Sequence, residues 1–193
     1  MRLGVLNHGY GPGTKLLFAL IQLFSRHPVP DAAKVVFYRP DFYGSRAKEF
    51  THEAMRGPSA WSVADRELMA AYVSKVNESA FCIGAHTATA RQAYQDGPKV
   101  ATVLTDLESA PVEDGLRATL RMLGKLTREG KLGTEDMQHV LSAGVSAQQV
   151  KDALAVCAAF NTTDRLADAF GFEVLSPESF EAGARYLLKR GYR

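Results

Sequence analysis

The sequence predicts an all-α protein. Apolar residues recur at helical spacing along the whole chain, and no stretch shows the alternation of apolar and polar residues that is typical of a strand. Glycine, proline and capping residues interrupt this pattern at intervals, as expected between helices. The chain has 193 residues, of which 46% are hydrophobic and 23% are charged. This length and composition are typical of one globular domain with a substantial core, which we expect to span residues 1–193.

The composition argues against several other classes of protein. The 23 basic and 21 acidic residues nearly cancel, so the sequence has no basic footprint for nucleic acid despite a pI of about 8.5. No stretch approaches the roughly 20 apolar residues of a membrane span, and no signal peptide opens the chain. Two cysteines are too few for a disulfide scaffold. We therefore expect a cytoplasmic protein that binds neither nucleic acid nor a membrane.

The helices of the N-terminal third are predicted from their apolar faces and from the prolines that stop them. Each apolar segment is followed by a proline, alone or in the pair Gly57-Pro58, which a helix cannot readily pass. The helices predicted in this way cover residues 16–24, 31–37 and 41–56.

Most of the later helices are predicted from capping residues. Ser62 precedes Asp65 by three residues and Ser146 precedes Gln149 by three, which is the spacing of a capping box. Ser176-Pro177 opens the last helix in the same manner. The remaining predicted helices cover residues 62–77, 79–95, 100–108, 112–127, 134–144 and 146–170, and one more begins at Ser176.

The residue of greatest chemical interest is Cys82, in the first turn of the helix that begins at Ser79. Unpaired backbone N–H groups and the helix dipole favour an anion there, so we expect the pKa of the Cys82 thiol to be lowered. His86 lies one turn further along the same face, within reach of a proton near the sulfur. Ser79 is the expected N-cap, and its hydroxyl is expected to accept the N–H of Cys82 or to donate to the sulfur.

This spacing does not by itself establish a reactive thiol. A cysteine four residues before a histidine occurs often by chance, and an interior cysteine usually behaves as a small hydrophobic residue. We expect that role for Cys157, which lies in an apolar helix. The sequence shows neither a four-ligand zinc cluster nor a phosphate, haem or dinucleotide motif, so we expect no metal and no cofactor.

The segment around Cys82 resembles the alkyl hydroperoxidase D family, the peroxidase-related members of the carboxymuconolactone decarboxylase superfamily. A later stretch, residues 160–171, is similar to the C-terminal signature of that group. The similarity touches most of the chain. The residues that carry it in the first segment are Trp61-Ser62, Arg66-Glu67-Leu68, Tyr72-Val73-Ser74, Asn77, Phe81-Cys82 and Gly84-Ala85-His86.

The family motif consists of a glutamate, two cysteines in C-x-x-C spacing and a distal histidine. The glutamate matches Glu67, the second cysteine matches Cys82 and the histidine matches His86, whereas the first cysteine falls on Ser79. A histidine that some members carry before the second cysteine is Phe81 here. Because Ser79 has no thiol, the chain cannot form the internal disulfide of the family's two-thiol enzymes.

The resemblance implies an antioxidant peroxidase in which the Cys82 thiolate attacks a small hydroperoxide and leaves a sulfenic acid. Glu67 and His86 are implied as the proton relay, and an external thiol as the reductant. A homo-oligomer, a trimer or a dimer of trimers (hexamer), is also implied. Spacing alone does not bring Glu67 to Cys82: Glu67 lies ten residues before Asn77, about 15 Å along a helix, while Cys82 lies only five after it.

Three other functions remain open. A lyase or isomerase of the decarboxylase branch would use His86 and Glu67 for acid–base work on a small carbonyl acid. A non-catalytic oligomer would retain a degenerate redox site with an unreactive Cys82. A helical transcription regulator ranks lower, because the N-terminal segment is apolar and glycine-rich rather than basic.

Overall fold

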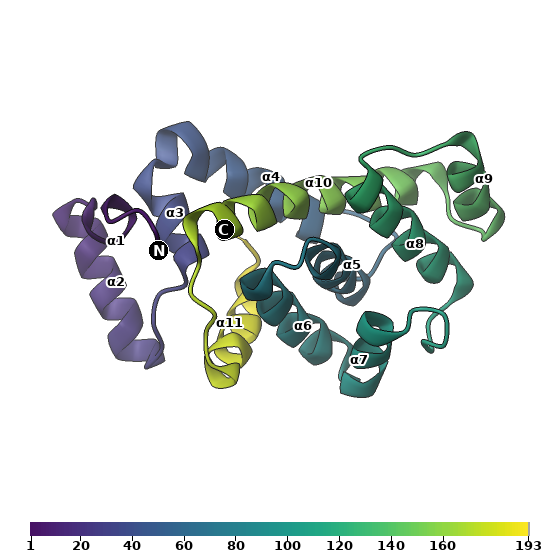
Figure 1. The fold of residues 1–193 in the computed structure, drawn as a ribbon. Coiled ribbons are helices and arrows are strands. Elements are labelled where there is room, and N and C mark those ends of the chain that lie inside the picture. The colour runs from purple at the N-terminus through teal and green to yellow at the C-terminus, as the bar shows by residue number, and fades with distance from the viewer. Residues whose placement is uncertain (193) are drawn as a thin grey trace.

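The computed structural model describes residues 1–192 and confirms the all-α prediction (Figure 1). Within that range the regular elements are α-helices and one π-helical turn, and no strand is present. The helices are α1 (Val5–His8), α2 (Pro12–Ser25), α3 (Asp31–Tyr38), α4 (Ser45–Arg56), α5 (Val63–Val76), α6 (Ala80–Tyr94), α7 (Gly97–Thr105), α8 (Asp114–Glu129), α9 (Thr134–Ser142), α10 (Ala147–Phe170) and α11 (Pro177–Arg190).

The capping residues set the helix boundaries as the sequence predicts. The Ser62 hydroxyl accepts the backbone N–H of Asp65 and the Asp65 carboxylate accepts that of Ser62, which completes a capping box at the start of α5. Ser146 and Gln149 form the same arrangement at the start of α10.

Two predicted boundaries in other helices are wrong. Residues 40–44 form a separate π-helical turn, η1 (Pro40–Gly44), so α4 begins only at Ser45. In this turn Gly44 packs closely against the backbone of Val36. A Cβ at Gly44 would lie 1.9 Å from the Val36 carbonyl oxygen, so the turn requires glycine at this position. The second error is at α7, which begins at Gly97 because Pro98 fits its first turn and Asp96 caps it.

The antiparallel hairpin of α5 and α6 lies at the centre of the molecule (Figure 1). Its turn passes through Asn77 and Glu78, with Glu78 in the left-handed region at φ 59°. The long helix α10 crosses α5, and α11 packs along α6. Two helices distant in sequence, α10 and α11, therefore pack against the hairpin that carries Cys82.

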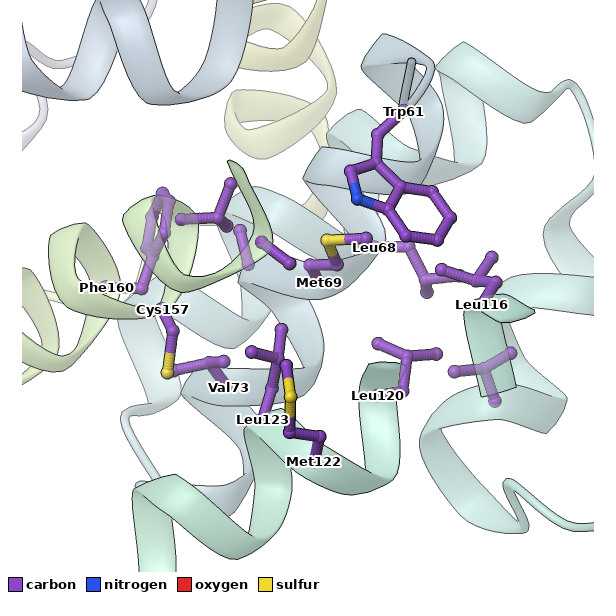
Figure 2. Packing of buried hydrophobic residues seen from close by; sticks show 14 of the residues in the cluster. Trp61, Leu68, Met69, Val73, Leu116, Leu120, Met122, Leu123, Cys157 and Phe160 are labelled. Carbon is purple, nitrogen blue, oxygen red and sulfur yellow. The ribbon is translucent and has the colours of Figure 1, made fainter. Parts of the chain in front are cut away.

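The main hydrophobic core forms where α5, α8 and α10 meet. Leu68 and Met69 of α5, Leu120 and Leu123 of α8 and Phe160 of α10 are at most 1% exposed there, and Figure 2 shows how closely they pack. A smaller cluster, separate from this core, includes Phe81, Cys82, Phe180 and Ala184. Cys82 thus belongs to a minor core beside α11.

Helix α2 differs from the other long helices because none of its residues is buried. It lies at one end of the molecule, away from the α5–α6 hairpin (Figure 1). Its exposed apolar side chains include Leu16, Leu20, Leu23 and Phe24, the last 81% exposed. Among the described residues, no helix is long and apolar enough to cross a membrane.

Candidate active site

Glu67 and His86 meet directly across the α5–α6 hairpin. The Nδ1 atom of His86 lies 2.8 Å from Oε2 of Glu67, and both residues are buried, at 6% and 0% exposure. Glu67 lies ten residues before Asn77 and His86 nine residues after it, so an antiparallel hairpin that turns at Asn77 brings the two into register. Glu67 therefore contacts His86 across the hairpin, while Cys82 lies one helical turn closer to Asn77.

The Glu67 carboxylate is held by three donors. Besides His86, Arg56 donates from Nη2 to Oε1 at 2.6 Å, and the hydroxyl of Tyr192 donates to Oε1 at 3.0 Å. Burial alone would raise the pKa of Glu67, but the hydrogen bonds and charges of His86 and Arg56 outweigh it and lower the pKa. Glu67 is thus an ionised carboxylate in the interior, neutralised by a buried guanidinium.

This carboxylate fixes the His86 ring. Because an ionised carboxylate only accepts hydrogen bonds, Nδ1 must carry the proton, and in the neutral ring Nε2 is then the free acceptor. Phe160 contacts the ring in a T-shaped arrangement, with centroids 4.3 Å apart, and Tyr192 stacks on it at 6.3 Å. The imidazole is therefore held in one orientation with a proton-accepting nitrogen left over, as general acid–base chemistry requires.

Tyr192 is a site residue that the sequence did not reveal. Its backbone N–H donates to Nδ1 of His52 on α4 at 3.2 Å, and its ring lies 5.1 Å from the Arg56 guanidinium. Burial, followed by the Glu67 charge, raises the pKa of Tyr192 well above its usual range, so the hydroxyl stays protonated as a donor. Tyr192 follows α11 in an unpatterned stretch, and only the docking of that helix brings it to Glu67.

Cys82 lies one turn before His86 on α6, as predicted, but its electrostatic environment contradicts the prediction. The residue is 1% exposed, and burial followed by the charge of Asp164 raises the pKa of the thiol. The expected lowering by the helix N-terminus is therefore wrong, because desolvation and a neighbouring carboxylate outweigh the dipole. Cys82 rests as a thiol.

Ser79 is the N-cap residue of α6, but its hydroxyl does not cap the helix. It donates instead to Oδ1 of Asp168 on α10, at 3.0 Å. The expectation that this hydroxyl accepts the N–H of Cys82 is thus wrong, because α10 offers a stronger, charged acceptor. Ser79 still lowers the pKa of Cys82, although less than burial and Asp164 raise it.

Asp164 is the second site residue that the sequence analysis missed. It is 0% exposed, and its carboxylate accepts hydrogen bonds from the Ser74 hydroxyl at 2.9 Å and the Asn77 amide at 2.8 Å. Its charge also acts on the Cys82 thiol, whose pKa it raises. Burial raises the pKa of Asp164. The Asp–Arg–Leu pattern of its segment reads as an exposed helical turn, and only the crossing of α10 over α5 buries it.

Cys157 has the core position that was predicted (Figure 2). It is 1% exposed, unbonded to another cysteine, and its sulfur receives a hydrogen bond from Nδ2 of Asn161 at 3.2 Å. Cys157 lies two turns before Asp164 on α10, about 10 Å along the helix. Cys82 and Cys157 are both unpaired and buried in this structure. In the part of the chain that the structure describes, no three His, Cys, Asp or Glu side chains are arranged to hold a metal ion.

Residues 43–123 match the carboxymuconolactone decarboxylase family, and this range contains Glu67, Ser79, Cys82 and His86. The predicted resemblance of this segment to the carboxymuconolactone decarboxylase superfamily is thereby confirmed. Asp164 and Tyr192 lie outside the matched range. Among curated proteins, no sequence matches the chain.

The fold is shared with two solved structures of peroxidase-related proteins. One, from Silicibacter sp. TM1040, has a TM-score of 0.78 at 24% identity over 93% of each chain. The other, described as an alkylhydroperoxidase AhpD core from Ralstonia eutropha JMP134, has a TM-score of 0.75 at 22% identity, over 95% of this chain and 96% of its own. The predicted alkyl hydroperoxidase D-like fold is thereby confirmed.

Proposed function

We propose that this protein is a thiol-dependent enzyme that reduces small hydroperoxides with Cys82 as the nucleophile. The observation that carries the proposal is the ordered Glu67–His86 pair one helical turn from that thiol. The family and the peroxidase-related proteins of the same fold support this chemistry.

The proposed reaction moves one oxygen atom and one proton. The sulfur of Cys82 attacks the terminal oxygen of the hydroperoxide, the O–O bond breaks, and a sulfenic acid and an alcohol are formed. The proton that leaves the thiol must reach the departing alkoxide. His86 can pass it on through Nε2, because Glu67 stabilises the imidazolium that forms in between.

The reductant in this proposal is an external thiol. Ser79 has no sulfur to close a disulfide, and Cys157 is packed in the main hydrophobic core, apart from the cluster that holds Cys82. Because Cys82 is 1% exposed, local opening of the structure around it is part of the proposed cycle.

Hydroperoxide consumption with a dithiol reductant tests this proposal. We expect the Cys82→Ser variant to lose consumption entirely and Cys157→Ser to retain it, since Cys157 has no part in the reaction. Unchanged consumption by Cys82→Ser would refute the function.

A lyase or isomerase that uses His86 and Glu67 is the second candidate. The protonated state of Cys82 favours it, because acid–base chemistry at His86 does not need a thiolate. Turnover of a small carbonyl acid that survives Cys82→Ser but not His86→Gln would select this function over the peroxidase.

We further propose that the protein acts as a homo-oligomer in which α2 contacts another copy. None of the side chains of this 14-residue helix is buried: Phe18 contacts the rings of Tyr10 and Phe37, but Leu16, Leu20, Leu23 and Phe24 stay exposed. Sedimentation of the wild type should give a trimer or hexamer, and Leu20→Glu with Phe24→Glu should reduce its mass. A monomeric wild type contradicts this proposal.

A further inference from the structure

The hydroxyl of Tyr192 lies beside both members of the Glu67–His86 pair, although the proposed reaction does not involve it. It donates to Oε1 of Glu67 at 3.0 Å and lies 3.2 Å from Oε2, the oxygen that accepts Nδ1–H of His86. The same hydroxyl lies 3.5 Å from that Nδ1 atom. Tyr192 and His86 are therefore two donors that share one carboxylate.

Contacts with α4 hold Tyr192 in this place. Arg56 donates from Nη2 to the carbonyl oxygen of Leu187 at 3.1 Å, near the end of α11, and its guanidinium lies over the Tyr192 ring. The chain then turns at Gly191, with φ 68°, where a Cβ would lie 2.7 Å from the His52 ring. The backbone N–H of Tyr192 donates to Nδ1 of His52. These contacts fix the ring independently of its hydroxyl, so the oxygen can be removed while the ring stays in place.

The hydroxyl affects how strongly Glu67 binds the proton of His86. Each donor that a carboxylate accepts withdraws negative charge from its oxygens and makes it a weaker acceptor for the other donors. An ionised carboxylate stabilises an imidazolium more than a neutral imidazole. By weakening Glu67 as an acceptor, Tyr192 therefore favours the neutral ring of His86, in which Nε2 is free to accept a proton.

We propose that Tyr192 is a positioning residue that acts through Glu67 to keep His86 neutral at rest, with Nε2 ready to accept the proton of the Cys82 thiol. This inference rests on the proposed function, in which an imidazolium could not take up that proton. The thiol proton passes to Nε2 and from there to the alkoxide, and Tyr192 keeps its own proton throughout. Burial, followed by the charge of Glu67, raises the pKa of Tyr192 well above its usual range, which agrees with this role as a donor.

Other groups also act on His86, from each of the elements around it. Arg56 of α4 reaches it through Glu67 of α5, to which both donate. From α10 the ring of Phe160 contacts the imidazole, and Asp164 interacts with it electrostatically. On α6 itself, Cys82 lies one turn earlier. Because all of these groups stay in place when the Tyr192 hydroxyl is removed, this change isolates the contribution of one oxygen atom.

Tyr192→Phe tests the proposal through the pH dependence of Cys82 oxidation by hydrogen peroxide, with the sulfenic acid trapped and quantified by mass spectrometry. We expect the variant to be about three- to tenfold slower than the wild type at about pH 6 and close to it at about pH 8, because His86 retains its additional proton only under acidic conditions. Tyr186→Phe, at an exposed tyrosine of α11, is the control and should match the wild type at every pH.

The Nδ1–H proton of His86 gives a second readout that does not depend on activity. In protein with isotope-labelled histidine, we expect its NMR resonance to move downfield in Tyr192→Phe, because Glu67 becomes the stronger acceptor, and to stay in place in Tyr186→Phe. Fluorotyrosine at position 192 has a more acidic hydroxyl and should move the resonance in the opposite direction. The fluorotyrosine protein decides the question if Tyr192→Phe does not fold.

The outcomes separate this inference from the function on which it rests. If the wild-type Cys82 is not oxidised, the peroxidase function fails, while a shifted Nδ1–H resonance still supports the action of Tyr192 on His86. A rate that falls by the same factor at every pH would show that Tyr192 supports only the fold, and the inference would be overturned. An Nδ1–H resonance that does not move in either Tyr192 variant would overturn it as well.

Discussion

At the His86 end of the site, the buried carboxylate of Glu67 pairs with the guanidinium of Arg56. At the Cys82 end, the buried carboxylate of Asp164 has no Lys or Arg partner among the described residues. Glu67 accepts from Arg56, whose side chain is only 11% exposed, and the pKa of Glu67 is lowered. Asp164 accepts from the neutral groups of Ser74 and Asn77, and its pKa is raised. Both carboxylates are fully buried, so the charges around each decide the direction in which its pKa is shifted.

The same contrast separates the two cysteines. Cys82 and Cys157 are equally buried at 1% exposure, and burial raises the pKa of both thiols. The hydrogen bonds of Thr127 and Asn161 lower the pKa of Cys157, and the charge of Asp164 raises the pKa of both thiols. After burial, the charge of Asp164 is the largest influence on Cys82 but the smallest of those on Cys157.

Removing the cation at the His86 end should have the largest effect. Arg56→Met leaves Glu67 as an uncompensated buried charge, and we expect a loss of about 3–5 kcal/mol in the free energy of unfolding, measured with urea. Arg121→Met is the matched control: it breaks an exposed pair with Glu108, which solvent screens, and should change the stability far less. Equal losses in the two variants would show that the Glu67–Arg56 pair has no special role.

Removing the charge of Asp164, at the Cys82 end, should instead raise the free energy of unfolding. The pKa of Asp164 is raised on folding, so above its ordinary value of 3.8 the folded protein holds a proton that the unfolded chain has lost. Stability therefore falls as the pH rises through this window and stays low above it.

Asp164→Asn should accordingly be more stable than the wild type at pH 7, by about 1–2 kcal/mol or a few degrees in Tm. The difference should vanish below pH 3.8. Calorimetry at both pH values checks this, with Asp168→Asn, an exposed acid, as the control. A variant that is less stable at pH 7 would mean that Ser74 and Asn77 compensate the charge fully.

The smallest effect is expected from Tyr192→Phe. It removes one hydrogen-bond donor to Glu67 but keeps the ring that stacks on His86. The expected loss of stability is about 1 kcal/mol. Tyr186→Phe provides the control, because Tyr186 is 57% exposed. An equal effect of the two changes would remove Tyr192 from the site.

The sequence predicted the helices well because its capping residues and prolines act locally. Ser62 with Asp65 and Ser146 with Gln149 each fix a boundary within four residues of chain. The contact between Glu67 and His86 was also predictable, since both lie about equally far from Asn77. The resemblance implied the same pair as a proton relay, and the structure brings the two side chains together.

Asp164 and Tyr192 could not have been found in this way. Asp164 becomes buried only because α10 crosses α5, and Tyr192 reaches Glu67 only because α11 packs along α6. Neither crossing leaves a local pattern in the sequence. The predicted thiolate was wrong for the same reason, because the dipole of α6 is a local property and the charge of Asp164 is not.

The most direct test of the account is to treat the wild type with one equivalent of hydroperoxide and identify the product at Cys82 by mass spectrometry. The account predicts a trapped sulfenic acid on Cys82, an unmodified Cys157 and no disulfide between them. An unreacted Cys82 in the folded protein would contradict it.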